Sequence, residues 1–153
     1  MHDYFYHNLG QTMTLTAADG TDLNLQPTEE LAFAGAHLYG YSYLYDKKVA
    51  ATGKDVKATF TIDMKDKGGD DIVMNLWMKG EPDREVFTAL SPMTEGLSRT
   101  PGMPYNIKEQ PTLTFVARQH GEAWTRPFVA IYEPSTKKEP SAIQSVSLSL
   151  IHI

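Results

Sequence analysis

The segment GEAWTRPFVAIYEP, residues 121–134, contains residue types that could recognise a ligand. On a β-strand, Glu122, Trp124 and Arg126 would point to one face. An indole there could stack on a sugar ring, and a guanidinium could pair with a substrate carboxylate in bidentate fashion. The alternative is an internal Trp–Arg–Glu arrangement, with the cation over the indole, and it is the interpretation that we favour.

The residues that follow continue the same alternation. Phe128, Ala130 and Tyr132 share one register, with Val129 and Ile131 opposite, so we expect this strand to be buried on both faces. Pro127 lacks an N–H and therefore marks an edge or a bulge.

A second unusual pattern is LYGYSYLYD, in which Tyr39, Tyr41, Tyr43 and Tyr45 occupy every second position. In a strand they would line one face with flat rings and polar rims, which suits stacking on sugars or contact with another domain. Aromatic packing between sheets is the interpretation that we favour. If the face is exposed, we expect a domain interface before a sugar platform, because large apolar patches are rare on monomers.

The opening residues HDYFYHN include types that bind zinc, namely His2, Asp3 and His7. Strand geometry places His2 on one face and the other two on the opposite face, so we predict strand packing and no metal site. The sequence also contains no Gly-rich phosphate loop and no nucleophile-elbow pattern. We therefore predict no catalytic residue set within the chain and no cofactor.

Composition narrows the classes of partner. The net charge of −5 argues against a general affinity for nucleic acid or for anionic membranes. No apolar run approaches the roughly 20 residues of a membrane span. The chain has no cysteine, which excludes disulfides and thiolate sites. The residues after Met1 do not resemble a signal peptide, so we expect any export signal to lie upstream.

These candidate residues must be positioned by strands, because alternation of apolar and polar residues recurs along the chain. Turn signals separate the alternating runs, and residues 65–71 read as a hairpin loop. A helical turn near residues 28–31 is an option, and residues 91–110 form the longest irregular piece. We predict one domain over residues 1–153, an all-β antiparallel β-sandwich of about eight or nine strands. Its apolar runs are 13–15, 58–64, 72–78, 113–117 and 146–150.

Two segments resemble a known family. Residues 2–10, HDYFYHNLG, and residues 121–134 are similar to segments in the β-rich C-terminal part of heparinase II/III-like polysaccharide lyases, in the same order and at a fitting separation. The resemblance covers the chain to about residue 147. It implies a β-sandwich that accompanies a helical toroid in an enzyme cleaving acidic polysaccharides by β-elimination. The family's catalytic and metal-binding residues lie largely upstream of the matched segments, so the resemblance carries no such role onto His7 or Asn8.

The resemblance implies a partner and a compartment as well as a fold. An acidic polysaccharide and a missing or separate helical toroid are the implied partners, and the location implied is periplasmic or extracellular. We predict an accessory β-sandwich domain that is not catalytic on its own. The alternatives are a stand-alone carbohydrate-binding module and a complete small lyase. Trp124, Arg126 and the tyrosine row are the candidate contact or interface residues.

Overall fold

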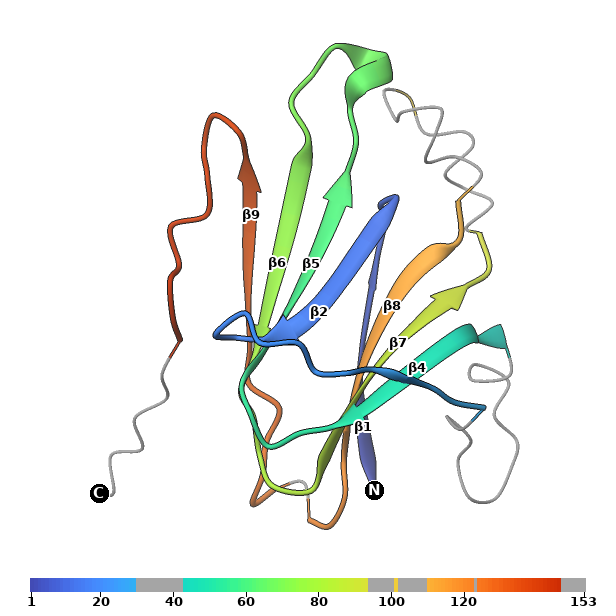
Figure 1. Cartoon of the computed structure of the whole chain (residues 1–153), viewed down its shortest axis with the longest axis vertical. Coiled ribbons are helices and arrows are strands. Elements are labelled where there is room, and N and C mark those ends of the chain that lie inside the picture. Colours follow the sequence, from blue (N-terminus) through green and yellow to red (C-terminus); the bar gives the residue numbers. More distant parts are fainter. Residues whose placement is uncertain (30–42, 94–100, 102–109, 123, 147–153) are drawn as a thin grey trace.

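The computed structural model describes residues 1–29, 43–93, 101, 110–122 and 124–146. These residues form two antiparallel sheets and confirm the predicted all-β sandwich (Figure 1). The five-stranded sheet has the order β1 (His2–Asn8), β8 (Thr112–Gln119), β7 (Arg84–Ser91), β4 (Tyr45–Ala51) and β3 (Gln26–Pro27). The four-stranded sheet has the order β2 (Thr12–Ala17), β5 (Val56–Ile62), β6 (Ile72–Met78) and β9 (Ala130–Thr136).

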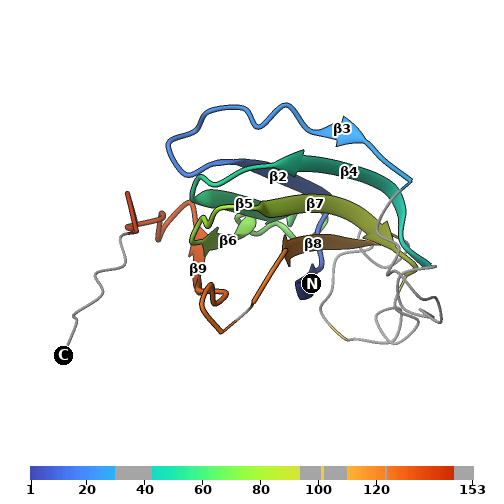
Figure 2. The same ribbon diagram turned by 90° about the horizontal axis from the view of Figure 1, so that it is seen from below.

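The core lies between the two sheets and is built by the inward residues of the alternating runs. Figure 2 shows β3, β4, β7 and β8 following one another in one layer. Burial of these apolar side chains is the main stabilising term of such a fold. The buried cluster comprises Leu15, Ala50, Val56, Ala58, Phe60, Leu76, Met78, Val86, Leu113, Phe115 and Ala117.

The outer face of the five-stranded sheet carries a second buried cluster. Pairing aligns Phe5, Val116, Phe87 and Val49 in one row across four strands. Phe87 and Val116 are buried there, and every residue of β8 is buried. Strand β8 is therefore a central strand with both faces covered.

Two local predictions can be compared with the described strands. The loop between β5 and β6 confirms the expected hairpin connection and contains a single 3-10 turn, Lys65–Lys67. The strand expected over residues 121–132 is wrong, because β9 begins only at Ala130. That strand forms the edge of its sheet, with Ile131 and Tyr132 exposed, so it is not buried on both faces. Half of the candidate helical turn at 28–31 and most of the last apolar run, 146–150, lie outside the described residues.

A carboxylate on β9 holds the segment that follows this strand. The side chain of Glu133 accepts hydrogen bonds from the Ser141 hydroxyl and from the backbone N–H groups of Ala142 and Ile143, the last at 2.9 Å. These bonds, led by that of Ser141, lower the pKa of Glu133. Because the charged form is the better acceptor, the carboxylate ties the segment back onto the sheet.

The sign of this shift predicts an acid-sensitive attachment. A lowered folded-state pKa means that the tie is complete above the ordinary pKa of glutamate and is lost as the pH falls through the lowered value. We expect the amide proton resonance of Ile143 to titrate in that acidic range. In Glu133→Gln, the same resonance should show no such titration. An unchanged titration in the variant would assign the transition to another group.

A close backbone crossing joins the loop after β6 to the loop after β4. A Cβ atom added at Gly80 would lie 2.3 Å from the carbonyl oxygen of Gly53. The Gly80 N–H also donates to the carboxylate of Asp55 at 2.8 Å, and the Lys79 ammonium reaches the same oxygen at 2.7 Å. This crossing leaves no room for a side chain at position 80.

Replacing this glycine therefore tests the crossing. We expect Gly80→Ala to destabilise the protein by about 3 kcal/mol, because backbone must move to accept the methyl group. The matched control is Gly53→Ala on the opposite side of the crossing, where the nearest atom would lie at an ordinary 3.7 Å. The control should change the unfolding free energy by less than about 1 kcal/mol. Urea denaturation of both variants provides the comparison, and equal midpoints would contradict the crossing.

Candidate functional site

The loops that follow β6 and β8 meet at one end of the sandwich, the lower end in Figure 1. They meet because β7 and β8 are paired, with Arg84 opposite Gln119, so the residues just beyond these strand ends are neighbours. The His120 N–H donates to the Asp83 carbonyl at 3.4 Å. Between the loops lies an open hollow of about 320 Å³, which we call the terminal depression, lined by Asp83, His120, Gly121, Glu122, Thr125 and Arg126.

Arg126 is one of the predicted site residues, and the structure places it in this depression. Its guanidinium donates to the Asp83 carboxylate at 2.8 Å and to the Pro82 carbonyl at 3.1 Å. The Asp83 side chain is 70% exposed and that of Arg126 is 35% exposed. An ion pair with this much solvent around it contributes little to stability.

Trp124 lies beside the depression on a turn. The Glu122 carbonyl accepts hydrogen bonds from the Thr125 N–H at 3.3 Å and from the Thr125 hydroxyl at 2.9 Å. The tryptophan side chain is left 76% exposed. The expectation of an internal Trp–Arg–Glu arrangement on a strand face is therefore wrong. The turn directs the indole into solvent, and Arg126 pairs with the preceding loop instead.

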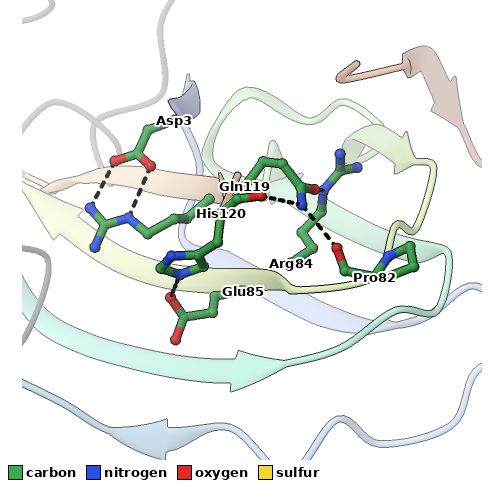
Figure 3. A network of polar contacts seen from close by, with 7 residues as sticks. Asp3, Pro82, Arg84, Glu85, Gln119 and His120 are labelled. Carbon is green, nitrogen blue, oxygen red and sulfur yellow. Dashed lines mark hydrogen bonds and ion pairs between the residues drawn. The ribbon is translucent and has the colours of Figure 1, made fainter. Parts of the chain in front are cut away.

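His120 adds an imidazole to the lining. Its Nε2 atom lies 2.8 Å from a carboxylate oxygen of Glu85, which comes from the outer face of β7 (Figure 3). Both side chains are partly exposed. The pair is an ion pair only when the imidazole is protonated.

Two buried polar side chains support the loops from beneath. Arg84 is 2% exposed and Gln119 is fully buried, and the arginine Nε donates to the glutamine Oε1 at 2.9 Å (Figure 3). Gln119 in turn donates to the carbonyls of Pro82 at 2.9 Å and His120 at 3.0 Å. One amide therefore ties together the two loops that line the depression.

Arg84 extends this support to the segment that carries Trp124 and Arg126. Its guanidinium donates to the carbonyl of Lys79, and to those of Arg126 at 3.4 Å and Pro127 at 3.3 Å. It also lies over the Phe128 ring, 4.8 Å from the centroid. Burial lowers the pKa of Arg84, and Glu81 opposes this. Because an arginine side chain stays protonated in proteins, these carbonyls solvate a buried cation.

The two described tyrosines of the row, Tyr43 and Tyr45, are at the other end of the sheet. Tyr45 pairs with Leu90 near the end of β7, whereas Asp83 precedes the start of that strand. Tyr43 and Tyr45 are 61% and 47% exposed, with Leu44 buried between them. For these two residues the favoured interpretation, packing between sheets, is wrong. Tyr39 and Tyr41 lie outside the described residues, so the full row remains a prediction.

The residues considered as metal ligands have other partners. Asp3 accepts two hydrogen bonds from Arg118, at 2.9 and 2.8 Å, in a buried pair. The Nδ1 atom of His7 lies 3.0 Å from the Thr114 hydroxyl, and burial lowers the pKa of this imidazole. Among the described residues, no three histidines or carboxylates converge as a metal site would require.

In the same part of the chain, none of the helical structure is of a length and hydropathy that would cross a bilayer.

Sequence reasoning identified Trp124 and Arg126 but missed Asp83, His120, Arg84 and Gln119. The sequence signal that could have found two of them is a large polar residue at the end of an apolar run. Arg84 begins the run that forms β7, and Gln119 ends the run that forms β8. Such residues inside a strand need internal partners, and loop carbonyls are the nearest acceptors.

Comparison with known proteins identifies one curated relative. The chain is 33% identical over 149 residues to an endo-acting ulvan lyase of Formosa agariphila. The match covers 95% of this chain and 17% of the lyase, so the chain spans about a sixth of that relative. No protein-family model and no solved structure matches the chain.

The match defines the class of protein to which the chain is similar. The chain is a β-sandwich that is similar to a segment of a polysaccharide lyase. This supports the broader part of the family resemblance, namely similarity to a polysaccharide lyase. The relative that matches is an ulvan lyase, and nothing in this match points to the heparinase II/III type in particular.

The buried support under the depression can be tested by removing the bridging amide. We expect Gln119→Ala to cost on the order of 2–3 kcal/mol, since it leaves buried groups of Arg84 and two loops without partners. Gln26→Ala is the control, because that amide is exposed and, within the described part of the chain, donates to nearby Asn24. Thermal unfolding of the two variants measures the difference. Similar stabilities would show that the amide bridge contributes nothing.

Proposed function

We propose that this chain is an accessory β-sandwich domain of a polysaccharide lyase and is not catalytic on its own. The observation that carries the proposal is the match of nearly the whole chain to a small fraction of an endo-acting ulvan lyase. An enzyme of that kind has most of its residues outside the matched segment. The substrate class that follows is an acidic polysaccharide such as ulvan.

The lining of the terminal depression supports the non-catalytic part of this proposal. Elimination from a uronate needs a base near the C5 proton and a group that neutralises the carboxylate. Of the described residues in the depression, His120 could accept a proton, but it bonds to Glu85, and no tyrosine is in the lining set. Arg126 is paired with Asp83. The groups for elimination are therefore not assembled there.

We extend the proposal to the architecture of the whole enzyme. The segments 2–10 and 121–134 favour a heparinase II/III-like arrangement, in which a helical toroid supplies the chemistry and residues 1–153 form one domain beside it. Tyr43 and Tyr45 are the candidate interface with that toroid, because their rings are exposed together. An enzyme acting on polysaccharides outside the cell would be periplasmic or extracellular.

A stand-alone carbohydrate-binding module is the second candidate. The exposure of Trp124 favours it, because an indole face open to solvent can stack on a sugar ring. Arg126, on the same turn, supplies hydrogen-bond donors next to the ring. In this function the chain would bind the polysaccharide without any need for the toroid.

The test is incubation of the folded chain with ulvan while the ultraviolet absorbance of unsaturated uronate product is followed. We expect no increase in absorbance, since the required base and neutralising group are not brought together. An increase that depends on the protein would overturn the accessory proposal in favour of a complete small lyase. Calorimetric titration of the same mixture separates the two candidates: measurable affinity favours the binding module, and none favours a domain whose contacts are with the toroid.

A further inference from the structure

The charge of the terminal depression limits what it can bind. Its lining includes the carboxylates of Asp83 and Glu122 but the single guanidinium of Arg126 among the described residues. Glu85 adds a third carboxylate behind His120. A uronate entering this hollow would meet acidic groups at close range, and the one cation is already paired with Asp83. Like charges brought together without compensation oppose binding.

The same groups suit the hydroxyl groups of an uncharged sugar. A carboxylate accepts hydrogen bonds only, and a guanidinium donates only. The Arg126–Asp83 pair therefore presents donors and acceptors side by side, as two neighbouring hydroxyl groups require. The hydroxyl oxygen of Thr125, whose proton is given to the Glu122 carbonyl, can still accept. The exposed indole of Trp124 offers a flat apolar surface on the same turn.

The site is also held in place before any ligand arrives. Arg84 and Gln119 bond to carbonyls on both loops from within the core. Loops that are fixed in this way lose little conformational entropy on binding, which improves affinity for a weakly held sugar.

We propose that the terminal depression binds an uncharged sugar residue of the polysaccharide, with Trp124 stacked on the ring and the Arg126–Asp83 pair bonded to adjacent hydroxyls. This assignment rests on the proposed polysaccharide function and narrows it. It differs from the pairing of Arg126 with a substrate carboxylate, which was one of the options that the sequence left open. Uronates would extend from the depression into solvent.

The first experiment measures binding of ulvan and of carboxyl-reduced ulvan by calorimetric titration. We expect the reduced polymer to bind at least as tightly as the native one. Trp124→Ala should weaken both by about three- to tenfold through loss of stacking. The matched control is Met93→Ala, an exposed apolar residue beyond the opposite end of β7. It should leave both affinities unchanged, and thermal unfolding should confirm that all variants are folded.

A second variant tests the charge argument directly. Asp83 has a backbone φ of 58°, a conformation that asparagine tolerates better than most residues, so Asp83→Asn preserves the loop. Removing this carboxylate frees Arg126 to pair with an anion. We expect the variant to gain affinity for native ulvan relative to the reduced polymer, by about tenfold for one new charge-assisted pair.

Each other outcome has a distinct meaning. Loss of binding on carboxyl reduction would overturn the assignment to an uncharged sugar and leave the polysaccharide function standing. Binding that is unaffected by Trp124→Ala but is lost in a Tyr43→Ala/Tyr45→Ala double variant would place the sugar at the other end of the sheet. Binding of neither polymer would overturn this assignment and the binding-module candidate together. The absorbance experiment would still decide the accessory proposal separately.

Discussion

The arrangement of the candidate site depends on a buried guanidinium that has no carboxylate directly bonded to it among the described contacts. Arg84 is surrounded instead by the glutamine of the next strand, by loop carbonyls and by the face of Phe128. A cation in such a place is tolerated only while these acceptors stay in position, because the cost of an unsolvated charge is several kcal/mol. The positions of the loops are therefore constrained by the hydrogen bonds that their carbonyls must make to the buried Arg84 guanidinium.

This constraint explains how short irregular segments can carry a defined surface. Among the described residues of the Trp124 turn, two hydrogen bonds are internal, and the Glu122 carbonyl accepts both. Its position relative to the preceding loop comes from the contacts beneath it. The neighbouring crossing of Gly80 against Gly53 restricts the other side of the same end of the sandwich. Rigid support under exposed side chains is the arrangement that recognition sites generally require.

Much of the fold could be predicted from the sequence because it depends on a local signal. Alternation at Ala58 and Phe60, or at Leu113 and Phe115, defines an inward face wherever the strand is placed. The same reasoning failed at Trp124 and Arg126, whose spacing is that of a strand. There, Gly121 has a φ of +84° and the Glu122 carbonyl closes a turn, so the chain leaves the extended conformation.

The candidate site was only partly predictable for a related reason. Exposure of Trp124 follows from that turn, and the pairing of Arg126 with Asp83 joins residues far apart in sequence. Strand pairing brings them together, and alternation does not encode which strands pair. The partners of Arg84 are backbone carbonyls, which every residue possesses, so the sequence contains no mark of them.

The separation of the two exposed aromatic groups has a mechanical consequence. Tyr45 and Asp83 lie near opposite ends of β7, a strand of eight residues, which at roughly 3.3 Å per residue spans about 26 Å. The intervening distance is set by a hydrogen-bonded sheet with both faces packed, and not by a linker. A polymer bound at one end of the sheet and a domain attached at the other end would thus be kept at a fixed distance from each other.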